Sequence, residues 1–253
     1  MNATLKRTLR QLLPRTLKPH TIFAGPLRDY RIVTSWHDYP AAILGRTERE
    51  LVEWFAQNVR AGETWLDIGA HYGYTAIALS HYVGATGRVF AFEPMLTSAG
   101  CLTQTRRLND LAQLTVVPLG LGDARLGLER LPVVRGMVDS TLRANGHSWQ
   151  ETFLVAQLDE VWQEICGGNA RVDGIKVDVQ GMELNVLRGM KDLLRSQQPK
   201  VIVEVHAGVA RDELRALLAQ VGYTREAIPI ESVADARSAQ LLDDKSYLFL
   251  PNE

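Results

Sequence analysis

The stretch that decides the fold is WLDIGAHYGYTAIALS, residues 65–80. Its apolar first part carries Asp67, and Gly69 and Gly73 follow before the pattern becomes helical. Glycine permits a tight turn and a close approach of the backbone to a ligand, and the first turn of a helix offers amide hydrogens to an anionic group. We therefore predict a buried strand, a turn that contacts a ligand, and a helix, in that order.

The segments around this stretch repeat the order of strand and helix. Strands that are apolar on both faces and alternate with helices are typical of a parallel sheet covered on both sides. We predict an α/β fold with a doubly wound, mostly parallel sheet, an antiparallel closing strand and a small inserted β-segment at about 124–160. The expected strands are 64–70, 88–94, 114–123, 173–181, 200–205, 227–230 and 246–251, and the expected helices are 47–62, 74–83, 96–110, 182–197 and one ending near 221. The first helix has the spacing of a capping box, from Thr47 to Glu50.

The composition excludes several classes of partner. The chain has 253 residues, is 46% hydrophobic and has a formal net charge of -1, which gives no general attraction to nucleic acid. No apolar run approaches the ~20 residues of a transmembrane segment. Cys101 and Cys166 lack metal-ligand spacing, and the basic start lacks a secretory core, so we expect a cytoplasmic protein with a small-molecule partner.

Residues 1–46 are expected to form an extension to one domain at 47–253. The first part has leucines on one helical face among basic residues, and Pro14 should end that helix. A membrane surface, the protein's own flank or another subunit would suit it, and the last two are favoured, including a possible homo-oligomer. The later part contains Trp36, His37, Asp38 and Tyr39, which, with Arg135, Ser140, His147 and Trp149 of the inserted segment, are candidates for a substrate pocket or for hydrophobic packing alone.

Acidic residues end the first three predicted strands. Asp67 lies in the first, Glu93 ends the second about twenty residues after Gly73, and Asp123 follows the third. A glutamate there accepts hydrogen bonds from ribose hydroxyls, and an acidic group on the third strand can reach an adenine amino group. The turn reads D-x-G-x-x-x-G and lacks the G-x-G-x-x-G of dinucleotide sites. The order favours an adenosyl ligand, although each acid alone could be a helix cap.

Two charged residues fall in a strand that should be central and buried. Lys176 and Asp178 occur in GIKVDVQGMEL, and burying either charge unpaired would cost several kcal/mol. One interpretation is a buried ion pair that includes Glu204. The other is that Asp178 faces the cofactor or a substrate hydroxyl, with Gln180, Glu183 and His206 around the same mouth.

At this point the chain resembles a known family. The motifs WLDIGAHYGYTAIALS, RVFAFEP, GLGD, STL, IKVDVQGMELNVLRGM and PKVIVEV are similar to those of FkbM-type S-adenosylmethionine-dependent methyltransferases, from about Thr64 to the end. The resemblance implies a Rossmann-like, class I methyltransferase fold and S-adenosyl-L-methionine as cofactor. It implies that Asp178 lines the active site and that the cofactor contacts Asp67, Gly69, Ala70, His71, Gly73, Glu93, Asp123 and Asp178. His71 and Gln180 depart from the asparagine and glutamate usual at these positions.

The expected reaction is O-methylation of a hydroxyl on a sugar, polyketide or other small metabolite by in-line displacement. A base must take the hydroxyl proton, and Asp178 and His206 are the candidates. Asp178, Glu183 and Glu204 could bind Mg²⁺ if they converge, but no motif requires a metal, and we expect none. The alternatives are an NAD-dependent oxidoreductase, which uses the same fold, and a non-catalytic cofactor-binding or docking protein.

Overall fold

A seven-stranded sheet organises the chain, in the order β12-β13-β11-β10-β3-β4-β5. The computed structural model describes residues 12–134, 137–138, 150–168, 170–231 and 241–252. The strands from β11 to β5 are parallel, and β13 runs antiparallel to β11 and to β12. The predicted mostly parallel sheet with an antiparallel closing strand is thus confirmed. The strands are β3 (Thr64–Ile68), β4 (Arg88–Phe92), β5 (Leu114–Val117), β10 (Gly174–Val177), β11 (Lys200–Val205), β12 (Ile228–Pro229) and β13 (Lys245–Phe249).

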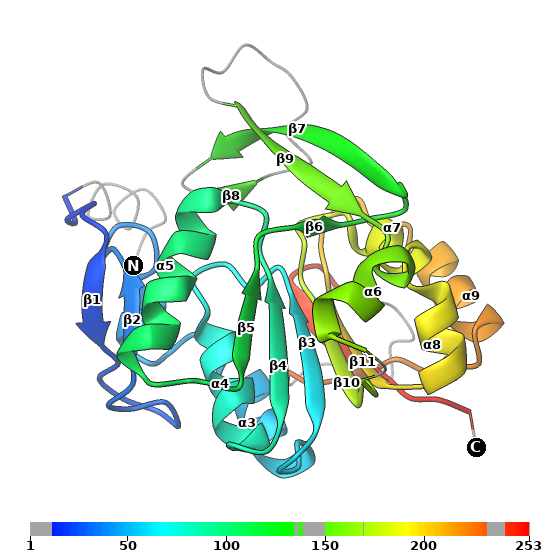
Figure 1. Cartoon of the computed structure of the whole chain (residues 1–253), viewed down its shortest axis with the longest axis horizontal. Helices are drawn as coiled ribbons and strands as arrows, with labels where there is room; N and C mark the ends of the chain where they lie inside the picture. Colours follow the sequence, from blue (N-terminus) through cyan, green and yellow to red (C-terminus); the bar gives the residue numbers. More distant parts are fainter. Residues whose placement is uncertain (1–11, 135–136, 139–149, 169, 232–240, 253) are drawn as a thin grey trace.

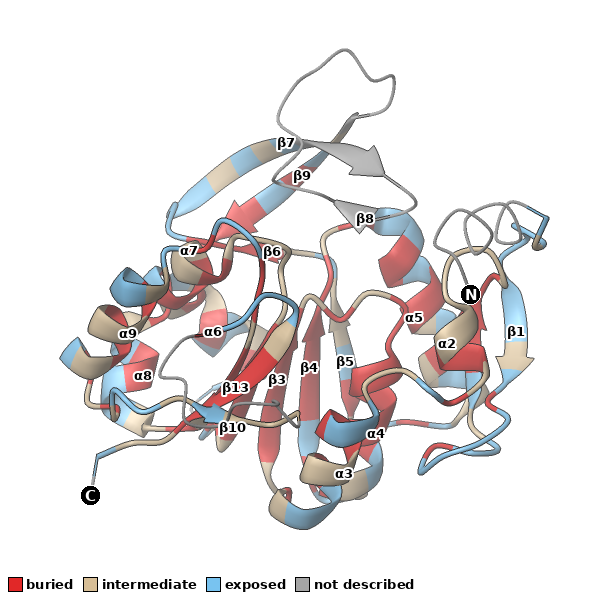
Figure 2. Ribbon diagram, turned by 180° about the vertical axis from the view of Figure 1, so that it is seen from behind, coloured by how far each residue is buried: buried red, intermediate tan, exposed pale blue. Residues whose placement is uncertain are grey.

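Helices cover both faces of this sheet (Figures 1 and 2). Because successive strand residues point to opposite faces, Leu66 and Ile68 pack in the core with α6–α9, whereas Trp65 packs in the core with α3–α5. Each fully buried side chain of this size contributes about 1.5–3 kcal/mol. The helices are α3 (Arg49–Asn58), α4 (Tyr74–Val83), α5 (Leu96–Leu108), α6 (Leu158–Cys166), α7 (Glu183–Arg188), α8 (Lys191–Gln197) and α9 (Arg211–Gln220). Both cysteines are buried and free of disulfides.

Three predicted elements differ from the structure. The helix predicted at 47–62 begins at Arg49 without a side-chain cap and ends at Asn58, so the capping box was wrong. The strand predicted at 114–123 is divided into β5 and β6 (Gly120–Leu121), which join different sheets. The helix predicted at 182–197 is two helices, separated where Gly189 passes so close to the Gly122 carbonyl that an added Cβ would lie 1.8 Å from its oxygen.

The inserted β-segment forms a hairpin over the end of the sheet (Figure 1). Its strands β7 (Leu126–Val134) and β9 (Gln150–Ala156) are antiparallel, β6 pairs with β9, and β8 (Met137–Val138) pairs with β7. The hairpin crosses the end at which β4 and β5 terminate. The insertion ends earlier than expected, because residues from Leu158 onward form α6, an amphipathic helix with Leu158, Trp162 and Cys166 buried.

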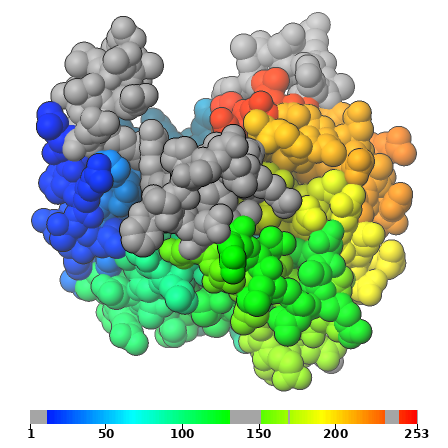
Figure 3. Space-filling model, turned by 90° about the horizontal axis from the view of Figure 1, so that it is seen from above, coloured from blue at the N-terminus to red at the C-terminus, as the bar shows by residue number. Residues whose placement is uncertain are grey.

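The N-terminal extension packs beside α5. It contains the hairpin of β1 (Lys18–Thr21) and β2 (Arg31–Thr34), followed by α2 (Pro40–Ile43). The Val33 amide donates to Thr105 Oγ1 of α5 over 2.9 Å. Seen from above, the extension and the helices that follow β10 lie on opposite sides of the molecule (Figure 3). Most of the predicted basic helix, and the candidates Arg135, Ser140, His147 and Trp149, lie outside the residues described.

Within the described residues, no helix has both the length and the apolar character needed to cross a bilayer.

Candidate active site

A cavity of about 260 Å³ opens at the carboxyl ends of β3, β4, β10 and β11. After β3 the chain adds β4 and β5 on one side and then returns to place β10 on the other side. In doubly wound sheets, ligands bind outside the strand ends at this switch in strand order. The N-terminal extension and the inserted hairpin complete the wall, through Tyr39 and Phe153 among others.

Glu93, directly after β4, is held in the cavity wall by two backbone amides. Its Oε2 accepts from the His71 amide and its Oε1 accepts from the Met95 amide, both over 2.9 Å. The side chain is 5% exposed, and burial raises the pKa of Glu93 to about 7 despite these two bonds. Each carboxylate oxygen can accept a second hydrogen bond. Glu93 is therefore fixed in position and still able to bind a pair of hydroxyls.

The two glycines of the turn after β3 are required by packing. Gly69 has φ +83°, and a Cβ added there would lie 1.8 Å from the Asp178 carbonyl oxygen. Gly73 has φ +93°, and its added Cβ would lie 2.2 Å from Leu102 Cδ1. Gly69 lines the cavity together with Ala70 and His71, whereas Gly73 is not part of the lining. Gly73 instead sets the start of α4, whose first-turn residues Tyr74 and Thr75 line the cavity and leave amides without intrahelical partners.

His71 is a neutral ring in this wall. Burial lowers the pKa of His71 to about 4. The ring lies 4.0 Å from that of Tyr72 and 5.3 Å from that of Tyr39, measured between centroids. Its Nε2 is buried and has no hydrogen-bond partner among the described residues. His71 therefore offers the cavity wall a polar group, because the Nε2 of a neutral imidazole can donate or accept one hydrogen bond.

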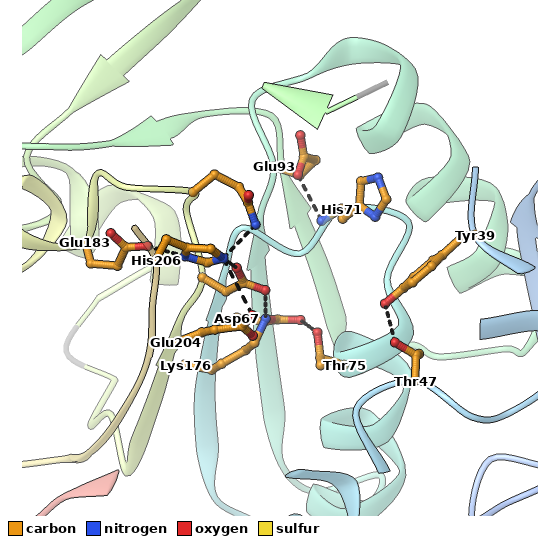
Figure 4. Close-up of polar contacts among 12 residues, drawn as sticks. Tyr39, Thr47, Asp67, His71, Thr75, Glu93, Lys176, Glu183, Glu204 and His206 are labelled. Carbon is orange, nitrogen blue, oxygen red and sulfur yellow. Dashed lines mark hydrogen bonds and ion pairs between the residues drawn. The ribbon is translucent and has the colours of Figure 1, made fainter. Parts of the chain in front are cut away.

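Lys176, which lines the cavity, contacts two carboxylates (Figure 4). Its Nζ lies 3.0 Å from Asp178 Oδ2 and 3.7 Å from Asp67 Oδ1, and Lys176 is 2% exposed. Asp67 is directly opposite Lys176 on the neighbouring strand, and its Oδ2 accepts from Thr75 Oγ1 over 2.7 Å. Asp67 is fully buried and does not line the cavity. The expected ion pair is present, with Asp67 in place of Glu204 as the second contact of the ammonium.

Ionisation in this cluster follows from the pairing. Burial opposes charge on Asp178, but the Lys176 ammonium and His206 hold the pKa of Asp178 below its ordinary value. Burial likewise opposes charge on Lys176, yet Asp178 and Asp67 raise its pKa. Asp178 lines the cavity; its Oδ1 is buried, makes no hydrogen bond among the described residues and lies 3.6 Å from His206 Nε2. Asp178 is therefore an ionised carboxylate with one oxygen that can still accept a hydrogen bond.

His206 lies behind this wall and does not line the cavity. Its Nδ1 donates to Glu183 Oε1 over 2.6 Å, and its Nε2 lies 2.8 Å from the Gln180 amide nitrogen. Burial lowers the pKa of His206, but the bond to Glu183 and the charge of Asp178 outweigh it and raise the pKa to about 9. A ring that is protonated at neutral pH has no lone pair to take a proton, so His206 is poorly placed as the base.

Two glutamates that the sequence did not assign to catalysis also line the cavity. Glu204 is held 3.6 Å from His206 Nε2, and burial together with Asp178 and Glu48 raises the pKa of Glu204 to about 8. Glu48 precedes α3 and adopts a left-handed conformation, φ 48°. The sequence around Glu48 has the pattern of a helix start and predicts no cavity residue there. No local signal in the sequence places Glu48 near β10.

Asp123 lies apart from the other strand-end acids. It is exposed, and its Oδ2 accepts from the Asn185 side chain over 2.9 Å. It lines an adjoining cavity of about 240 Å³, not the one that Glu93 faces. The strand expected to deliver it ends at Val117, and Leu119 and Leu121 occupy the corresponding part of the main cavity.

Three residues with metal-ligating groups lie close together at this mouth. Among the described residues, Asp178, Glu204 and His206 have donor atoms within 4.8 Å of one another. Glu183, expected in that set, instead binds His206. The Lys176 ammonium contacts Asp178 and so already supplies a positive charge to this cluster.

Comparison with known proteins identifies the family. Residues 67–225 match the Methyltransferase FkbM domain. The chain belongs to the FkbM family of methyltransferases. This membership confirms the predicted family and supports S-adenosylmethionine-dependent methyl transfer, and it leaves the NAD-dependent oxidoreductase without support.

One relative of this FkbM-family chain is the hexuronic acid methyltransferase AglP of Haloferax volcanii, 30% identical over 189 residues that cover 72% of each chain. The structure of methyltransferase FkbM from Methylobacillus flagellatus matches with a TM-score of 0.51 and 18% identity, over 78% of this chain and 50% of that one. A putative rRNA methylase from Clostridium thermocellum matches with a TM-score of 0.51 and 11% identity, over 80% and 93%. At these identities the two structures support the class I methyltransferase fold alone. This chain spans half the length of the Methylobacillus flagellatus protein.

Proposed function

We propose that this FkbM-family protein transfers a methyl group from S-adenosylmethionine to a hydroxyl oxygen of a sugar or a related small hydroxylated metabolite. The observation that carries the proposal is that Glu93 and Asp178, from strands on either side of β3, line one cavity at the switch in strand order. The relative that acts on a hexuronic acid supports a sugar as acceptor.

The cavity has the donors and acceptors that the cofactor needs. The two oxygens of Glu93 suit the ribose hydroxyls, because each has remaining acceptor capacity. Met95, Leu121 and Phe153 supply an apolar wall for a flat base. The first-turn amides of α4 suit a carboxylate. When bound, S-adenosylmethionine supplies a methyl group activated by a sulfonium.

Residues of this chain then align and deprotonate the acceptor. In an in-line displacement the acceptor oxygen bonds to the methyl carbon as the carbon–sulfur bond breaks, and the electron pair of the broken bond stays on sulfur. We assign the hydroxyl proton to Asp178, whose Oδ1 makes no hydrogen bond among the described residues and whose carboxylate is ionised beside Lys176. His206 is held by its hydrogen bond to Glu183. In this proposal His206 positions Gln180 and Asp178 and does not take the proton.

The test is a methyl-transfer assay with radiolabelled S-adenosylmethionine over sugars, polyketides and simple alcohols. On an accepted substrate, Asp178→Asn should lower kcat by about 10²- to 10⁴-fold, the range lost with a general base. Asp123→Asn is the matched control, because the Asp123 carboxylate lies outside the main cavity, and this variant should have the kcat of the unaltered chain. Full turnover by Asp178→Asn would remove the assignment, and cofactor binding without turnover on the whole panel would favour a non-catalytic protein.

A further inference from the structure

The main cavity has a strong excess of acidic groups. Among the described residues that line it, five carry carboxyl groups and one carries an ammonium group: Asp38, Glu48, Glu93, Asp178 and Glu204 against Lys176. That ammonium is already shared between Asp178 and Asp67. The remaining basic ring in the described lining, His71, is neutral because burial lowers its pKa to about 4.

Glu48 is held toward this cavity by an unusual turn. It is the residue before α3, yet its side chain does not cap the helix, and its backbone is left-handed at φ 48°. Thr47, which should have capped the helix, has its hydroxyl 3.3 Å from that of Tyr39, and all three residues line the cavity. Within the described part of the chain, the Glu48 carboxyl group has no hydrogen-bond partner. It is thus free to accept hydrogen bonds from a ligand.

Glu48 and Glu204 reach the same cavity from different parts of the chain. Glu48 comes from the N-terminal extension's junction with α3, and Glu204 comes from β11. Burial raises the pKa of both glutamates, the charge of Asp178 adds to this rise, and the charge of Lys176 opposes it. Carboxyl groups on several walls suit a ligand with several hydroxyls, because each oxygen accepts hydrogen bonds from them.

We propose that this carboxyl-rich wall selects uncharged, polyhydroxylated acceptors over those that carry a carboxylate, and that Glu48 is a specificity-determining residue. The proposal rests on the function proposed above and narrows it. A carboxylate on the acceptor would add negative charge to a cavity in which Asp178 is already ionised and burial opposes charge on Glu93 and Glu204. It would also find no uncommitted cation among the described lining residues. Specificity by such repulsion is a common device at binding sites. The inference separates this chain from its relative named for a hexuronic acid.

The experiment uses matched glycosides that differ only at C6, methyl glucoside against methyl glucuronide, and the galacto and manno pairs. We measure kcat/KM for methyl transfer by the full chain, with cofactor affinity by calorimetry as a separate readout. The neutral member should be preferred at least about tenfold. Glu48→Gln should narrow the ratio of the two kcat/KM values, and Glu48→Lys should narrow it further or invert it. Glu50→Gln, an exposed position in the first turn of α3 that does not line the cavity, should preserve the ratio.

The outcomes distinguish the two proposals. Transfer that favours the uronides in the unaltered chain overturns this inference and leaves sugar O-methylation standing. Transfer to no member of any pair overturns the sugar acceptor and this inference with it. A neutral preference that is the same in Glu48→Gln overturns the role of Glu48. If Glu48→Lys loses its unfolding transition, Glu204→Gln provides the second variant, and it should also narrow the ratio.

Discussion

Lys176 donates a hydrogen bond to Asp178 over 3.0 Å while its ammonium also lies 3.7 Å from Asp67 on the adjacent strand. The two carboxylates and the ammonium connect β3 to the end of β10, and of the three only Asp178 and Lys176 line the cavity. Because all three groups are largely shielded from water, each depends on the others for compensation of its charge. The same arrangement keeps Asp178 ionised at the cavity wall.

Replacing the ammonium should destabilise the fold. Lys176→Met removes the ammonium that the Asp67 and Asp178 carboxylates share, and removal of one partner from a buried pair costs about 3–5 kcal/mol. We expect this loss in the free energy of unfolding, measured by urea denaturation. Arg195→Met, which removes an exposed pair with Asp192, should cost at most about 1 kcal/mol. Equal losses in the two variants would show that the buried cluster does not hold β3 and β10 together.

The turn after β3 offers a second test with a matched glycine. Gly69 and Gly208 have nearly the same φ, +83° and +88°, but an added Cβ meets the Asp178 carbonyl only at Gly69 and meets nothing at Gly208. Gly208→Ala should cost about 1–2 kcal/mol from backbone strain. Gly69→Ala should cost about 1–3 kcal/mol more from overpacking. Similar unfolding free energies would contradict the close approach of the turn to Asp178.

Stability should fall as the pH rises. Glu204 and His206 have raised pKa values, from 4.5 to about 8 and from 6.5 to about 9, so the folded state binds their protons more tightly than the unfolded state does. The contribution of His206 is fully present below pH 6.5 and is lost as the pH rises through about 9. Urea unfolding across this range should show the fall, and His206→Gln should flatten it. An unchanged slope in that variant would refute the role of the Glu183 contact.

Local sequence patterns predicted much of the fold because they reflect short-range physics. Helix α4 spans the predicted residues 74–83, and the strand cores around it are apolar on both faces. The antiparallel closing strand was also confirmed. The hairpin of β1 and β2 was missed because its strands are four residues long and carry little periodicity.

The site was less predictable because it depends on contacts between distant segments. Asp67 is turned to Lys176 by the pairing of β3 with β10, a register that neither strand specifies alone. Asp123 is carried away from the cavity because the chain leaves the main sheet after Val117. Glu48 joins the cavity because Thr47 contacts Tyr39 and does not cap α3. By contrast, Glu93 follows its strand directly and lies where the spacing predicted.

The most direct test of the central claim is calorimetric titration of the purified chain with S-adenosylmethionine, alongside the Glu93→Gln and Asp123→Asn variants. We expect saturable binding to the unaltered chain, a loss of at least about tenfold in affinity for Glu93→Gln because one acceptor oxygen is replaced by a donor, and less than about threefold for Asp123→Asn. A circular dichroism spectrum and an unfolding transition confirm that each variant is folded. No binding to the unaltered chain, or the same loss in both variants, would contradict a cofactor site at Glu93.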